Sequence, residues 1–141
     1  MNKLTLISAL CFSILFSCSD ENELKLTEGS LIGSWNYEKV LFNGEDISQL
    51  TPGFTVSNFL HLAEDHSAGK CYINGVWSIQ DGSLKLQWTH DNISNVYKIV
   101  NVSNTTLTLQ TELRQSEYGI SLPQFGEDEV ITITEQFVKM D

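Results

Sequence analysis

Short runs in which apolar and polar side chains alternate recur along most of the chain after residue 30. The clearest run is residues 84–89. Its apolar members are Leu84, Leu86 and Trp88, and its polar members are Lys85, Gln87 and Thr89. Because successive side chains of a strand point to opposite faces of a sheet, this period of two predicts a half-buried strand with one apolar and one wet face. The pattern indicates an all-β protein.

Seven runs of this kind follow one another, and turns rich in Gly, Asn and Asp separate them. They are residues 31–42, 58–63, 70–79, 84–89, 95–102, 106–113 and 130–139. An eighth strand is expected either in residues 55–57 or within residues 117–122. An antiparallel meander leaves two unpaired edges, which closure into a barrel removes. We therefore expect an antiparallel up-and-down meander that closes into a small barrel of about eight strands.

The parity of each run predicts which side chains point into the barrel. The residues expected to line its cavity or fill its core are Trp35, Cys71, Ile73, Trp77, Leu84, Leu86, Trp88, Tyr97 and Phe137. On the first strand, the count by twos places four more residues on the face of Trp35: Gly33, Tyr37, Lys39 and Leu41. Tyr72 falls on the opposite face from Trp77, so we expect it to be exposed.

Counting by twos along the last strand turns Glu135 inward together with Ile131. A buried carboxylate without a partner is costly. Glu135 is therefore expected either to pair with a base such as Lys39, or to be moved outside by a bulge in its strand.

The first 18 residues predict an export signal and a lipid anchor. Residues 4–16 follow Lys3 and form an apolar run of 13 residues. This run is short for a membrane span and has the length of a signal-peptide core. The run ends in Leu15-Phe16-Ser17-Cys18, which resembles the bacterial lipobox. This resemblance implies that Cys18 carries acyl chains such as palmitate and becomes the new N-terminus. The alternative is a signal peptide with an incidental cysteine.

The predicted organisation has three parts: a signal peptide at residues 1–17, the lipidated cysteine and an acidic tether at 18–28, and the barrel at 29–141. Residues 19–23 contain three acids. This run resembles the tether that displays certain Bacteroidota lipoproteins on the outer face of the outer membrane. The alternative is a solvated linker that keeps the domain off the lipid. We expect a protein anchored to the outer membrane of a bacterial cell envelope.

Charge and cysteine content restrict the partners and the means of stabilisation. The mature part carries seven bases and 18 acids, a formal net charge of −11, and such a surface repels phosphate. Nucleic acid is therefore not an expected partner. Cys11 leaves with the signal and Cys18 is acylated, so Cys71 remains alone and no intramolecular disulfide is expected. The domain must be held together by its core.

No sequence motif predicts an enzyme, a cofactor or a metal site. His61 and His66 are five residues apart, whereas a helical zinc motif needs two histidines at i and i+4. The acidic run 127–129 lacks the alternating ligands of a calcium loop. Cys71 has no neighbouring base in the sequence, so it is read as a small buried hydrophobe. We expect a non-enzymatic protein.

Residues 114–127 form a connection that is long for a hairpin. The apolar side chains in it are Tyr118, Ile120, Leu122 and Phe125. They predict either an irregular strand with its turns, or a lid over one mouth of the barrel, or a loop that binds a protein partner.

Three segments together resemble the lipocalin-like domain of Bacteroidota lipoproteins. They are Leu31-Ile32-Gly33-Ser34-Trp35, Gly75-Val76-Trp77 and Thr134-Glu135-Gln136-Phe137-Val138-Lys139. The resemblance covers roughly residues 29 to 140, and it implies an up-and-down barrel with room for an apolar ligand. In lipocalins a basic side chain packs over the tryptophan of the Gly-x-Trp motif. Lys139 has the parity to do this over Trp35 by a cation–π contact.

Three functions remain open from the sequence, and the third, an enzyme, has no motif to support it. The first is an outer-membrane-anchored, non-enzymatic binding module with a small lipophilic ligand in the barrel. The second is an envelope interaction module, an inhibitor or an accessory subunit, with a solid core and a protein partner. Eight strands are just wide enough to be filled by side chains or to hold one small ligand, so cavity volume separates the first two.

Overall fold

The computed structural model describes residues 26–50, 59–70, 72–90, 94–118 and 125–141. The helical elements in these ranges are α1 (Glu28–Leu31), η1 (Ser48–Leu50) and η2 (Gln115–Tyr118). The strands are β1 (Gly33–Phe42), β2 (Glu45–Asp46), β3 (Phe59–Leu62), β4 (Ser67–Lys70), β5 (Ile73–Gln80), β6 (Ser83–Trp88), β7 (Ser94–Val102), β8 (Thr106–Arg114) and β9 (Val130–Lys139). No helix among the described residues is long and apolar enough to cross a membrane.

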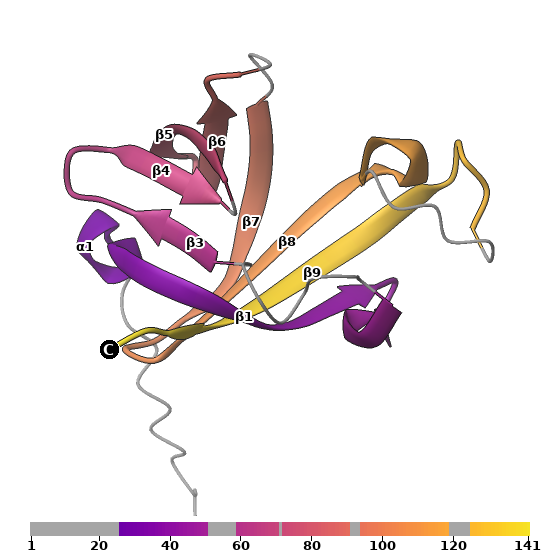
Figure 1. Ribbon diagram of the computed structural model, residues 1–141, viewed down its shortest axis with the longest axis horizontal. Coiled ribbons are helices and arrows are strands. Elements are labelled where there is room, and N and C mark those ends of the chain that lie inside the picture. The colour runs from indigo at the N-terminus through magenta and orange to yellow at the C-terminus, as the bar shows by residue number, and fades with distance from the viewer. Residues whose placement is uncertain (1–25, 51–58, 71, 91–93, 119–124) are drawn as a thin grey trace, which may run out of the picture.

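The strands form one antiparallel sheet that closes on itself. Their order is β2-β1-β3-β4-β5-β6-β7-β8-β9, and β1 also pairs with β9. Eight strands therefore make a closed barrel, and β2 is an extra strand beside the end of β1. The predicted all-β meander and its closure are confirmed. Figure 1 shows that β1, β8 and β9 run on past the part of the wall formed by β3 to β7.

The turns follow the chemistry of the sequence. The β5–β6 hairpin turns at Asp81 and Gly82, which have φ values of 49° and 75°. Two successive residues with positive φ match the twist of an antiparallel hairpin, and Asp-Gly is a favoured pair for this turn. The Asn43-Gly44 turn between β1 and β2 has the same character, with φ values of 48° and 87°.

The eighth strand lies where the sequence predicted a turn followed by the start of another strand. It is β4, and it pairs with β3 on one side and β5 on the other. Four residues with only Ala68 as an apolar member give no visible alternation, which is why the pattern failed here. The alternative sites at residues 55–57 and 119–122 lie outside the described residues, and residues 117 and 118 belong to η2.

A bulge in β1 reverses which residues face the core. The register of β1 against β9 shifts once, just before Lys39. Trp35 is buried ahead of this point, and Val40 and Phe42 are buried beyond it. The prediction that Lys39 and Leu41 share the face of Trp35 was wrong, because one extra residue in a strand inverts the alternation that follows.

The core has two parts. The first fills the closed barrel and comprises Leu31, Trp35, Leu60, Leu62, Ala68, Trp77, Leu84, Leu86, Trp88, Tyr97, Val102, Leu107, Leu109 and Phe137. The second lies along the far ends of β1 and β9 and comprises Val40, Phe42, Ile47, Ile131 and Ile133. Tyr37 packs against both parts. The boundary between the two parts therefore runs past Tyr37.

One end of the barrel is sealed around Trp35. Its indole Nε1 donates a hydrogen bond of 2.9 Å to the carbonyl of Leu31. The Nζ of Lys139 lies 5.1 Å from the centroid of the Trp35 ring, so the predicted cation–π contact is confirmed. Gly33 has φ +146°, and a Cβ there would lie 2.8 Å from Cε of Lys139. Glycine two residues before the tryptophan therefore leaves space for the lysine that covers it.

Candidate functional site

Most residues predicted to line a cavity or fill the core are buried in the barrel. They are Trp35, Trp77, Leu84, Leu86, Trp88, Tyr97 and Phe137. Ile73 departs from the prediction, because its side chain is 45 % exposed. It is the first residue of β5 and pairs with the last residue of β4, so it lies at the tip of a hairpin and not in the interior. Cys71 lies outside the described residues.

The candidate lid is described only in part. Phe125 is half-buried and packs on the second part of the core, with its ring centroid 6.2 Å from that of Phe42. Tyr118 is the last residue of η2. Ile120 and Leu122 lie outside the described residues. Phe125 thus contributes to packing, and the lid and partner-loop interpretations stay predictions.

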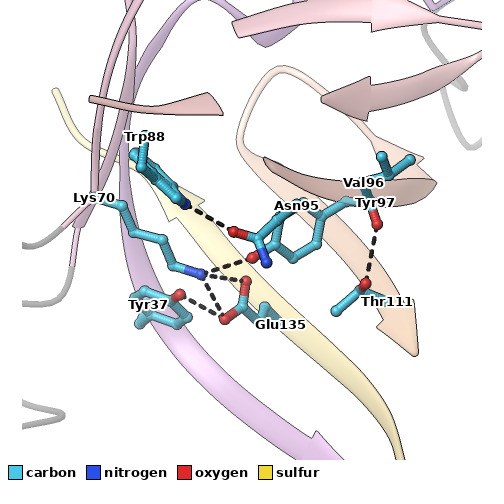
Figure 2. Close-up of polar contacts among 8 residues, drawn as sticks. All are labelled: Tyr37, Lys70, Trp88, Asn95, Val96, Tyr97, Thr111 and Glu135. Carbon is cyan, nitrogen blue, oxygen red and sulfur yellow. Dashed lines mark hydrogen bonds and ion pairs between the residues drawn. The ribbon is translucent and has the colours of Figure 1, made fainter. Parts of the chain in front are cut away.

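Four polar side chains meet inside the barrel at the boundary between the two parts of the core (Figure 2). They are Tyr37 from β1, Lys70 from β4, Tyr97 from β7 and Glu135 from β9, and we call them the polar quartet. Lys70 Nζ donates to Glu135 Oε1 at 2.9 Å and Oε2 at 3.0 Å, and to the Tyr97 hydroxyl at 3.1 Å. The Tyr37 hydroxyl donates to Glu135 Oε1 at 2.7 Å.

Glu135 faces inward because it lies between Ile133 and Phe137 in the regular alternation of β9. The prediction of a buried carboxylate paired with a base is confirmed, but the base is Lys70 and not Lys39. Lys39 instead lies on the surface, with its Nζ 3.3 Å from Asp46 Oδ2. The bulge that was considered for β9 occurs in β1, its partner strand.

Lys70 is the member of the quartet that the sequence did not predict. Residues 70–79 were read as one strand, whereas Lys70 ends β4 and pairs with Leu60 across the sheet. A lysine at the end of a short strand reads as a solvent-facing residue, since lysine is almost never fully buried unless it is paired. The buried Ala68, two residues earlier, is the one local sign that Lys70 points inward.

The quartet is shielded from solvent and electrostatically coupled. The side chain of Glu135 is 3 % exposed and that of Lys70 is 19 % exposed. Lys70 Nζ also lies 5.6 Å from the ring centroid of Tyr37 and 5.2 Å from that of Tyr97. Both rings thus flank the ammonium group while their hydroxyl groups take part in the hydrogen bonds.

The surroundings change the proton affinities of three members. Burial, together with the charge of Glu135, raises the pKa of Tyr37 well above its ordinary value, and burial raises the pKa of Tyr97. Burial alone would lower the pKa of Lys70, but Glu135 and the two tyrosines outweigh it and hold that pKa well above its ordinary value. Lys70 is therefore a cation and both tyrosines are neutral near neutral pH.

A tryptophan and an asparagine lie next to the quartet (Figure 2). Trp88 Nε1 donates a hydrogen bond of 2.8 Å to Oδ1 of Asn95. Trp88 is buried against Gly75, where a Cβ would lie 2.9 Å from Cε3 of the indole. Glycine at this position lets the indole approach the backbone of β5 closely.

Next to the quartet, the barrel wall opens between β7 and β8. Backbone pairing between β7 and β8 runs only as far as Lys98 and Gln110. Beyond that point the Thr111 hydroxyl donates a hydrogen bond of 2.9 Å to the carbonyl of Val96. Figure 1 shows the two strands diverging here. The quartet therefore lies near the level at which the closed barrel ends.

The remaining candidates for chemistry lie on the surface. The Ser34 hydroxyl and Nδ1 of the exposed His61 are 2.9 Å apart on the outer face of β1 and β3. The acidic run 127–129 is exposed, and Asp128 forms a loose ion pair with Arg114 at 3.7 Å. Within the described ranges, no group of three or more His, Cys, Asp or Glu residues could hold a metal ion.

Comparison with known proteins gives no relative from which a function could be transferred. No family model matches the chain, and no curated protein matches it significantly.

Proposed function

We propose that the protein is a lipid-anchored, non-enzymatic binding module of the bacterial cell envelope, which holds a small and largely apolar ligand in its barrel. The observation that carries this proposal is the polar quartet in an otherwise apolar interior. Small-molecule sites are lined mainly by apolar and aromatic side chains, with a few placed polar groups that fix orientation. The interior around Tyr37, Tyr97 and Trp88 has this composition.

The quartet is better explained by recognition than by stability. Removing two charges from water costs several kcal/mol each, and replacing a buried ion pair by apolar residues is often neutral or stabilising. Lys70 and Glu135 could therefore be exchanged for apolar residues without loss of the fold. Buried ionisable groups with strongly shifted pKa values are candidates for functional sites on physical grounds.

The proposed location follows from the first residues of the chain. Residues 15–18 supply the lipobox-like segment, and Cys18 is the proposed lipidation site in the outer membrane. The tether and the lipocalin-like family membership are part of the same proposal. Its support in the fold is the arrangement of Gly33, Trp35 and Lys139, which is the arrangement that the family resemblance implied.

A second candidate function is a module that binds an envelope protein. Five large apolar side chains favour it because they are exposed on β5, β7 and the turn before β5: Tyr72 at 84 %, Val76 and Val96 at 53 %, Val100 at 48 % and Ile73 at 45 %. Many core side chains are also almost fully buried, as a solid barrel would require.

Native mass spectrometry of the protein purified from its own envelope separates the two functions. The ligand-binding proposal predicts a mass shift of a few hundred daltons that disappears on denaturation. A bare domain that co-purifies with one envelope protein would contradict it and support the second candidate.

The anchor is tested by membrane fractionation of Cys18→Ala. The variant should leave the membrane fraction or remain unprocessed, since the acyl chains supply the attachment. Cys11→Ala is the matched control, because its cysteine leaves with the signal peptide, and it should fractionate like the wild type. A Cys18→Ala protein that is processed and still sediments with membranes at the wild-type level would refute the anchor.

A further inference from the structure

We infer that the barrel recognises the head group of its ligand through two hydrogen-bond donors, the Tyr97 hydroxyl and the Asn95 amide, and that this head group is an uncharged oxygen acceptor such as an ester or amide carbonyl. The inference rests on the proposed ligand-binding function and specifies the class of ligand.

All but one of the hydrogen-bond donors of the quartet are used within it. The three contacts of Lys70 Nζ account for its three N–H groups, and the Tyr37 hydroxyl donates to Glu135. The Tyr97 hydroxyl accepts from Lys70 and keeps its own proton. For that proton the structure shows no acceptor among the residues that it describes.

The side-chain amide of Asn95 also has unused donors. Its Oδ1 accepts the indole N–H of Trp88, so its two amide N–H groups are not used in that contact. No acceptor for them is found within the described part of the chain either. The site thus holds unused donors, whereas the acceptor atoms of Glu135 already receive three hydrogen bonds.

The two donors are close together, and Tyr97 is buried whereas Asn95 is partly exposed. Asn95 and Tyr97 are two residues apart on β7, so their side chains lie on the same face, about 7 Å apart along the strand. Tyr97 is only 5 % exposed, and Trp88 beside it is 8 % exposed. A ligand oxygen that accepts from the buried Tyr97 hydroxyl would therefore use a donor for which the described residues supply no acceptor. At the partly exposed Asn95 amide, the same oxygen would replace water. The hydrogen bond from Lys70 polarises the Tyr97 hydroxyl and makes it a stronger donor.

The charges select against ionised head groups. Lys70 and Glu135 neutralise each other, so a ligand carboxylate would have to displace the Glu135 carboxylate from Lys70 or lie beside it. A cationic head group would meet the Lys70 ammonium group. A neutral carbonyl avoids both conflicts and still accepts from Tyr97 and Asn95.

Three probes that each have a linear chain of ten carbons test this selection: methyl decanoate, the decanoate anion and the decyltrimethylammonium cation. Each is titrated at pH 8 into the purified mature protein after removal of any bound lipid, with tryptophan fluorescence as the readout. The expected result is that the ester binds at least tenfold more tightly than either ion.

Two variants locate the contact. Tyr97→Phe keeps the ring and removes the hydroxyl, and Asn95→Asp keeps an acceptor for Trp88 and removes both N–H donors. Each should weaken ester binding about five- to tenfold, which is the value of one net hydrogen bond. Tyr72→Phe changes an exposed tyrosine and should bind the ester like the wild type.

The outcomes separate this inference from the function on which it rests. Tighter binding of decanoate or of the cation would overturn the head-group assignment, and so would unchanged ester binding in both variants. In either case the ligand-binding function would stand. No binding of any probe would overturn the ligand-binding function and the inference with it.

Discussion

The ammonium group of Lys70 lies 2.9 Å from the carboxylate of Glu135 across the interior of the barrel. The two residues are 65 positions apart in the sequence. Around the wall, β1 and β3 separate their strands, so the pair spans the inside of the barrel and does not run along its surface. A charge pair that bridges the interior in this way makes the two residues dependent on each other.

Replacing only one residue of the pair should lower the stability of the protein, whereas replacing both should not. We predict that Lys70→Met lowers the free energy of unfolding by about 3–5 kcal/mol, because Glu135 is left buried without its partner. The double variant Lys70→Met/Glu135→Leu should regain most of this loss. Urea unfolding measures both. Lys39→Ala removes the exposed pair with Asp46 and should change little. A double variant no more stable than the single one would contradict the prediction.

Alkaline pH should destabilise the barrel through the quartet. The pKa values of Tyr37, Lys70 and Tyr97 are raised in the folded protein above their ordinary values near 10. A group with a raised folded-state pKa holds its proton more tightly when folded. Its contribution is complete below about pH 10 and is lost as the pH rises through the folded value. We predict that the wild type loses stability as the pH rises above about 10.

Tyr37→Phe provides the control for this pH dependence, because it removes one of the three titrating groups. Its stability should fall less steeply than that of the wild type when urea unfolding is repeated at one-unit steps from pH 8. Parallel curves would show that Tyr37 does not contribute in this way.

The alternation of β6 predicts opposite effects at adjacent positions. Leu86 is 1 % exposed, and Lys85 beside it points to the outer face. Leu86→Ala should cost about 2–5 kcal/mol because it leaves a cavity in the packed core. Lys85→Ala should stay within about 0.5 kcal/mol of the wild type. Similar losses in the two variants on urea unfolding would disprove the assignment of the faces.

Two glycines on neighbouring strands should respond differently to alanine. A Cβ on Gly75 would lie 2.2 Å from the carbonyl oxygen of Gln87 and would press on Trp88, so Gly75→Ala should destabilise by about 1–3 kcal/mol. A Cβ on Gly69 meets nothing nearer than 3.9 Å. Gly69→Ala should therefore be neutral or slightly stabilising. Thermal unfolding of the two variants, compared with the wild type, decides the point. Equal melting temperatures would refute the close contact at Gly75.

The sequence predicted those parts of the fold that depend on local alternation. Leu84 and Leu86 face the core, as the period of two requires, and the count by twos turned Glu135 inward. The bulge before Lys39 could not be predicted, because one extra residue inverts the parity of a strand and leaves no trace in composition. The prediction of exposed and buried residues therefore failed in the second half of β1.

The quartet itself depends on contacts between distant parts of the chain. Its members come from four strands, and Tyr37 is 98 residues from Glu135. An isolated lysine such as Lys70 reads as a surface residue until its strand and its partner are known. The need for a base near Glu135 could be inferred from the cost of burying a carboxylate. Which base fills that need depends on the register of β4.

The most direct test of the account is a comparison of bound ligand in two proteins purified side by side from the same envelope. One is the wild type and the other is Lys70→Met/Glu135→Leu, and native mass spectrometry measures the fraction of each that carries a lipophile. We predict that the wild type is loaded and that the double variant carries clearly less lipophile, because its Tyr97 hydroxyl loses the hydrogen bond from Lys70 that polarises it. The circular dichroism spectrum of the double variant should remain that of the wild-type barrel. Equal loading of the two proteins, or a wild type that carries nothing, would contradict the central claim that the polar quartet is a recognition centre.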